Sequence, residues 1–199
     1  GGNTAVGYNA LEDNVSGIQL VAIGYNALKD NTASYNTAVG HESLDANTTG
    51  SFNVAVGDGT LGSNVTGDSN VAVGHFALNN STASSNIGIG HNTLRSTTTG
   101  SANTAVGALC MDANTTGAYN VAFGVNTVGQ NTTGNYNSGF GASALHSNTT
   151  GSQNTGIGYN SLFTNTTANN NTALGYYSLR LNSTGLQNVA VGTNALDAN

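Results

Sequence analysis

The stretch Asn53-Val54-Ala55-Val56-Gly57 is followed seventeen residues later by Asn70-Val71-Ala72-Val73-Gly74, and the same pattern runs through the whole chain. Twelve units begin at residues 3, 20, 36, 53, 70, 86, 103, 120, 137, 154, 171 and 188. Two of the complete units have 16 residues and the others have 17. A short fixed period predicts a stacked solenoid, because one coil cannot bury its apolar face without its neighbours.

The first five positions of the unit predict a strand that ends at a tight corner. The fifth position is glycine in all twelve units, which indicates a positive φ or a close approach to the next coil. The second position alternates between Val or Ile and Thr or Ser, the third is Ala or Gly, and the fourth is always large and apolar. Such alternation with period two is typical of a β-strand.

The size of these side chains predicts which face of the strand is buried. We expect the second and fourth positions, such as Val54 and Val56, to point inward. The ninth position, which is Leu in ten units and Met111 or Val128 in the others, adds a second inward stripe. The Ala and Gly side of the strand then faces outward and favours close packing against a partner chain.

The second half of the unit predicts a short polar strand closed by a turn. It has the pattern Asn-Thr-Thr-Gly, as in Asn47 to Gly50 and Asn114 to Gly117. In the two shorter units this glycine is missing, and the loss of one turn residue is expected to leave the flanking strands in register. The first position is Asn in eleven units, so we expect a structural ladder of stacked amides.

These patterns together predict an all-β fold, a parallel β-solenoid or β-roll of about twelve coils of 16 to 17 residues. We expect residues 1–199 to form a single repeat domain without caps, as a segment of a longer fibre or filament.

Composition and charge exclude several classes of function. Only 6% of the residues are charged and the net charge is −6, so the chain lacks the basic surface that nucleic acid requires. No apolar run approaches the roughly 20 residues that span a bilayer. A single cysteine, Cys110, forms no intrachain disulfide.

The residues that usually carry chemistry do not converge on a site. His41, His75 and His91 occupy the sixth position, where the other units carry Tyr, Ala, Val, Asp58 or Thr193. Cys110 occupies the eighth position, where other units have Ala, Ser or Thr, and no base lies at a comparable place. The carboxylates are scattered over the unit. We therefore predict that the protein is not an enzyme, with no catalytic residue, no cofactor and no metal ligand.

The sequon Asn-x-Ser/Thr recurs at one place in the unit. Two interpretations stay open, a row of glycans on an exported chain or a plain Asn-Thr turn. The sequon asparagines are Asn14, Asn47, Asn64, Asn114, Asn131, Asn148, Asn165 and Asn182.

The motif Asn-Thr-Ala-Val-Gly-x-x-Ala-Leu resembles the head repeats of YadA-like trimeric autotransporter adhesins and the related repeats of phage and bacterial tail fibres. Asn53 to Gly57 and Asn70 to Gly74 match that pattern most closely, and the likeness covers essentially the whole chain. The resemblance implies a left-handed parallel β-roll, with three chains about one axis, displayed outside the cell for adhesion or as a fibre shaft.

The function expected from these observations is a structural or adhesive fibre segment outside the cell, on a cell or virion surface. Its expected partners are copies of itself, as a lateral trimer or stacked end to end, and a host surface or glycans. Two alternatives remain, an ice-binding module and a carbohydrate-binding module. The first would use aligned threonines, namely Thr48, Thr115, Thr132, Thr149 and Thr166 or Thr49, Thr116, Thr133, Thr150 and Thr167. The second would use exposed aromatic rings, namely Tyr8, Tyr25, Phe76, Tyr159, Tyr176 and Tyr177.

Overall fold

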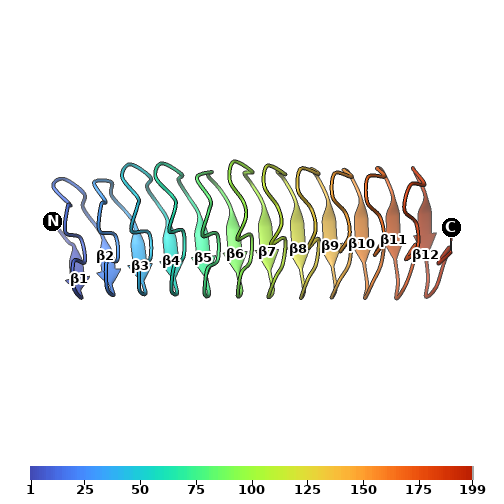
Figure 1. Cartoon of the computed structure of the whole chain (residues 1–199), viewed down its shortest axis with the longest axis horizontal. Coiled ribbons are helices and arrows are strands. Elements are labelled where there is room, and N and C mark those ends of the chain that lie inside the picture. The colour runs from blue at the N-terminus through green and yellow to red at the C-terminus, as the bar shows by residue number, and fades with distance from the viewer. Residues whose placement is uncertain (199) are drawn as a thin grey trace.

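The computed structural model describes residues 1–198 and shows an all-β parallel solenoid, as the repeat predicts (Figure 1). Twelve strands in these residues stack in chain order in one sheet, and the described chain contains no helix. The strands are β1 (Thr4–Val6), β2 (Val21–Ile23), β3 (Thr37–Val39), β4 (Val54–Val56), β5 (Val71–Val73), β6 (Ile87–Ile89), β7 (Thr104–Val106), β8 (Val121–Phe123), β9 (Ser138–Phe140), β10 (Thr155–Ile157), β11 (Thr172–Leu174) and β12 (Val189–Val191).

Equivalent positions of neighbouring units lie directly beside each other. In the pair β4 and β5, Val54 faces Val71 and Val56 faces Val73. The register is kept across the shorter units, because Val21 of β2 faces Thr37 of β3, as expected. Every position of the unit therefore forms a ladder along the long axis of the molecule.

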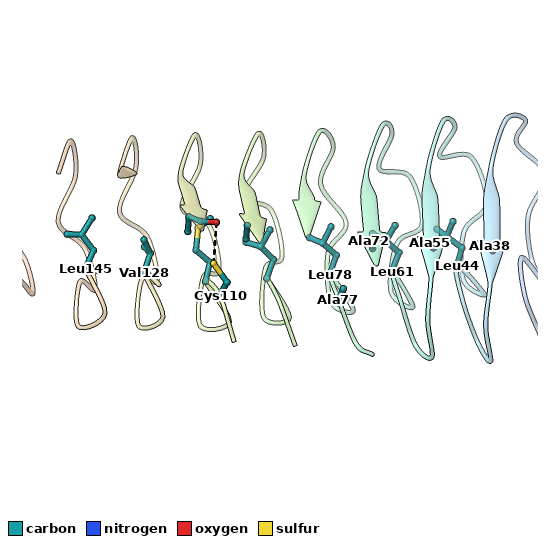
Figure 2. Packing of buried hydrophobic residues seen from close by; sticks show 14 of the residues in the cluster. Ala38, Leu44, Ala55, Leu61, Ala72, Ala77, Leu78, Cys110, Val128 and Leu145 are labelled. Carbon is teal, nitrogen blue, oxygen red and sulfur yellow. Dashed lines mark hydrogen bonds between the residues drawn. The ribbon is translucent and has the colours of Figure 1, made fainter. Parts of the chain in front are cut away.

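The interior of the coil is filled by the third and ninth positions. The ninth-position side chains are fully buried in the inner coils, which confirms the predicted Leu stripe. They pack against the third-position residues of the strands, and Figure 2 shows Leu61 beside Ala55 and Ala72. The core is thus a narrow layer of leucine against alanine or glycine.

The prediction that the second and fourth positions point inward is wrong. In β2 to β12 the middle residue of each strand is buried and the outer two are half-buried or exposed. Val54 and Val56 each keep 37% of their surface exposed, whereas Ala55 between them is fully buried. One leucine per coil already fills the space behind the strand, so only Ala or Gly fits opposite it. The face available to a partner is therefore the Val and Ile face, not the Ala and Gly face.

The corner glycine has both a positive φ and a close approach to the next coil, the two features that the sequence indicated. Gly107 has a φ of +137°, and a Cβ on it would lie 2.3 Å from the carbonyl oxygen of Gly124 in the next coil. A side chain at this corner would therefore strain the backbone and push neighbouring coils apart.

The second half of the unit is not a strand in the described residues, which corrects the expectation of a polar strand there. The residues of this segment form bends. The backbone N–H groups of Thr115, Thr116 and Gly117 all donate to the carbonyl oxygen of Thr132. A regular ladder needs one acceptor per donor along the strand, so the converging bonds stop the segment from extending.

The sequence pattern indicates that the position of the turn glycine is missing from the two shorter units. The structure shows that this position is present in them. The side chain of Asn47 donates to the carbonyl of Gly50 at 2.9 Å, and that of Asn31 donates to Ala33 at 2.7 Å. Ala33 therefore occupies the place of the glycine. The residue that is absent is the counterpart of the exposed Thr49.

Candidate interaction surfaces

The exposed positions of the unit fall into three groups, which we name by their content. The strand face consists of the second and fourth positions. The charged face consists of the sixth, seventh, tenth and eleventh positions, and the threonine face of the thirteenth, fourteenth, sixteenth and seventeenth. The charged face holds every Lys, Arg and Glu of the chain and every Asp except Asp68, which lies on the threonine face.

The strand face is an uncharged stripe along the whole sheet, apolar at the fourth position of every unit and at the second position of half of the units. Its fourth position is large and apolar in every unit, and between 37% and 44% of such side chains as Val56, Phe140 and Leu174 is exposed. Phe123 and Phe140 stack with ring centroids 5.4 Å apart. Soluble monomers seldom expose large contiguous apolar surfaces, and a continuous row of exposed apolar side chains of this kind is typical of an interaction site.

The charged face contains one cluster that the sequence interpretation missed. Asp58 lies in the coil between His41 and His75, and its two carboxylate oxygens are 2.9 Å from Nδ1 of His41 and 3.3 Å from Nε2 of His75. The ring of His91 stacks on His75 at 5.4 Å. The signal in the sequence is Asp58 at the sixth position, in the unit between those of His41 and His75. Within residues 1–198 no group of three or more His, Cys, Asp or Glu is arranged to hold one metal ion.

Aromatic rings of the charged face stack on one another. Tyr8 and Tyr25 are 5.4 Å apart with an angle of 12° between their planes, and Tyr159 and Tyr176 are 5.6 Å apart with an angle of 20°. The tilted ring of Tyr177 is covered by the guanidinium of Arg180 at 4.6 Å. Since stacking on a sugar requires a free ring face, this arrangement weighs against the carbohydrate alternative.

The first-position asparagines form the structural ladder that was predicted. Asn103 accepts a hydrogen bond at its Oδ1 from the backbone N–H of Asn120, 3.0 Å away in the next coil. The side chain of Asn120 in turn donates to the carbonyl of Gly134 at 2.9 Å. Both asparagines are fully buried. Each amide thus joins two coils and closes a corner.

The sequon asparagines form a second buried ladder. Nδ2 of Asn131 donates to Oδ1 of Asn114 at 2.8 Å and to the carbonyl of Gly134 at 3.0 Å. Asn14 is half-buried, and the other sequon asparagines are at most 1% exposed. Nδ2 is the atom that carries an N-linked glycan. The folded coil therefore supports the turn interpretation, because a glycan on a buried amide would displace both bonds.

Cys110 is packed in the core and its thiol is poorly suited to a nucleophile. Burial raises the pKa of the thiol to about 12, and Sγ lies 3.4 Å from the carbonyl oxygen of Ala122. A thiol with so high a pKa carries almost no thiolate at neutral pH. No pocket is hollowed into the surface of the described residues.

The two threonine ladders of the threonine face differ in their bonds. At the thirteenth position the hydroxyl donates to the carbonyl of the next coil, as from Thr115 to Thr132 at 2.9 Å and from Thr132 to Thr149 at 3.0 Å. At the fourteenth position the threonines are exposed, and their hydroxyls make no hydrogen bond within the described chain. These are Thr49, Thr66, Thr99, Thr116, Thr133, Thr150, Thr167 and Thr184.

Comparison with known proteins adds no relative to these observations. No family model, no curated protein and no solved structure gives a significant match to the chain. Residues 1–198 contain no helix that could cross a membrane.

Proposed function

We propose that the chain is a structural and adhesive segment of an extracellular fibre, on a cell or virion surface, in which copies of the chain associate side by side through the strand face. The single observation that carries the proposal is the apolar stripe along β1 to β12. Burial of such side chains contributes roughly 25 cal/mol for each Å² of apolar surface removed from water.

The strand face favours another copy of the same chain as its partner. Its fourth-position side chains recur once per coil over all twelve strands. Only a partner with the same repeat can contact every coil in the same way, and a second copy has that repeat. The negative charges do not oppose this packing, because they lie on the other two faces.

The charged face and the threonine face would form the outer surface of such an assembly. With the strand face covered, the charged face and the threonine face stay outside and are available to a host surface. Ladders of leucine and asparagine fill the interior. The resemblance to the repeats of trimeric adhesins and tail fibres supports the same assignment and a three-chain assembly.

Sedimentation equilibrium of the purified chain tests the proposal. The wild type is expected to form an oligomer, and the triple variant Val56→Asp, Val73→Asp, Ile89→Asp is expected to be a monomer, because carboxylates on the strand face cannot be buried. The matched control places the same charges on the charged face of the same coils, as Ser63→Asp, Asn80→Asp and Ser96→Asp, and should associate like the wild type. A wild type that stays monomeric at all concentrations would contradict the proposal.

A further inference from the structure

The threonine face carries a row of hydroxyl groups that the fold does not use. In the six successive coils of β6 to β11 the fourteenth position is threonine each time, always exposed and without an internal hydrogen bond. These residues are Thr99, Thr116, Thr133, Thr150, Thr167 and Thr184. The shorter units lack this residue altogether and still keep their strands in register. Folding alone therefore does not require threonine here.

The backbone beneath Thr116, Thr133 and Thr150 is held from coil to coil, because the N–H of each donates to a carbonyl of the next coil. The N–H of Thr133 and that of Thr132 both donate to the carbonyl of Thr149, at 3.2 Å and 2.8 Å. On the other side of the glycine, the N–H of Asn135 donates to Oγ of Ser152 at 3.0 Å, and the N–H of Ser152 donates to Oδ1 of Asn169 at 2.7 Å. Threonine is also stiff at χ1. The central part of the row is therefore pre-organised.

The spacing and the charge of the row restrict what it can bind. Neighbouring coils of a parallel sheet are about 4.8 Å apart, so methyl and hydroxyl groups recur at that interval. No charged residue occurs on the threonine face in the coils of β6 to β11. Charged groups order water around themselves in shells that do not fit a lattice. A regular, uncharged row instead matches a surface whose oxygen atoms repeat at a similar interval.

We propose that the threonine face binds ice. The hydroxyls of the row bond to water molecules at lattice spacing while the methyl groups limit the orientations of those molecules, and the rigid backbone lowers the entropy cost of adsorption. In the coils of Thr150, Thr167 and Thr184 the seventeenth position is the polar Gln153, Asn170 or Gln187. Tyrosines stand there in the two preceding coils. This activity does not depend on association through the strand face.

Thermal hysteresis and adsorption of fluorescently labelled protein to a single ice crystal test the proposal. The wild type is expected to show both. The variant Thr133→Lys, Thr150→Lys, Thr167→Lys is expected to lose most of the hysteresis, because its side chains cannot fit the lattice. The matched control carries the same charges on the charged face of the same coils, as Gln130→Lys, Ser147→Lys and Thr164→Lys, and should retain it. Circular dichroism checks that all variants keep the fold.

Three results would overturn the proposal. One is the absence of hysteresis and adsorption in the wild type, and another is an equal loss in the threonine variant and its control. The third is binding to microcrystalline cellulose or chitin without adsorption to ice, which would assign the row to a polysaccharide surface. The monomeric strand-face variant is expected to keep its ice adsorption, so failure of the fibre proposal and failure of this one are distinguishable.

Discussion

At the scale of single residues, the corner glycines have the least room for change. We predict that Gly107→Ala lowers the free energy of unfolding by roughly 2 kcal/mol or more, because strained φ and ψ alone cost about 1–3 kcal/mol and the new Cβ would meet the Gly124 carbonyl. Urea unfolding followed by circular dichroism measures this. Gly129→Ala is the control, since other units carry large residues at that position. Equal effects of the two substitutions would contradict the role assigned to the corner.

A buried sequon asparagine is expected to show what the amide ladder contributes. In the wild type, Nδ2 of Asn131 donates hydrogen bonds to Oδ1 of Asn114 and to the carbonyl oxygen of Gly134. In Asn131→Asp the carboxylate has no N–H to donate, so one of its oxygens would face these two acceptor oxygens without a hydrogen bond. An unsatisfied buried group costs about 1–3 kcal/mol, and more when it is charged. We predict a loss of stability at neutral pH of at least that size, measured by urea unfolding.

The pH dependence of this variant follows from the same burial. Desolvation raises the pKa of the new carboxyl in the folded state above its unfolded value of about 3.9. The variant is therefore most stable below the unfolded pKa and loses stability as the pH rises toward the folded pKa. The control is Asn135→Asp on the threonine face, because Oδ1 of Asn135 is already an acceptor, from the N–H of Ala118. If both variants had the same pH profile, the buried ladder would not be the cause.

At the scale of the element, the unit tolerates a change of length at one place only. We predict that deletion of Thr133 changes the free energy of unfolding by no more than about 0.5 kcal/mol, the usual size of a surface change. The shortened segment has the same length as the natural segment from Asn31 to Ser34. Thermal unfolding followed by circular dichroism measures the change.

Deletion of Gln130 is the contrasting case in the same coil. Every complete unit has two residues between its ninth and twelfth positions. In the inner coils the ninth-position and twelfth-position residues are themselves buried. Without Gln130, Val128 and Asn131 cannot both stay in their ladders, so this deletion should abolish the local structure. If the Thr133 deletion were as harmful as this one, the fourteenth position would not be dispensable.

The strands themselves were predictable and their orientation was not. The alternation at residues 53 to 57 shows that the two faces of β4 differ, and the constant glycine marks where β4 ends. Alternation alone does not tell which face is inside, and the rule that large apolar residues are buried chose Val54 and Val56. The deciding fact is that Leu61 lies behind the strand and leaves space only for Ala55. That depends on how the coil closes, which the local pattern does not contain.

The candidate surfaces were predictable to a similar degree. The threonine ladders follow directly from the repeat, but the different bonds of Thr132 and Thr133 depend on the path of the backbone. The pairing of Asp58 with His41 and His75 needed only the ladder at the sixth position. The burial of the sequon asparagines was not predictable, because an Asn-Thr turn is usually at the surface.

At the scale of the whole molecule, stability is expected to be local. Leu94 is fully buried, and Leu94→Ala should cost about 2–5 kcal/mol. Since each coil contacts only its neighbours, we predict faster amide hydrogen exchange in the coils of β5 to β7 and unchanged exchange in β10 and β11. Hydrogen exchange with mass spectrometry measures this, with Leu109→Ala on the charged face as control. Uniform acceleration along the chain would indicate one cooperative unit instead.

Because the strands pair in one-to-one register, the length of the molecule is proportional to its number of repeat units. Each further unit would lengthen the solenoid by about 4.8 Å and leave every existing contact in place. A duplication or loss of whole units, as unequal recombination between identical stretches of a gene produces, therefore alters reach without disturbing packing. Selection can adjust the length of such a protein in single steps, which most globular folds do not allow.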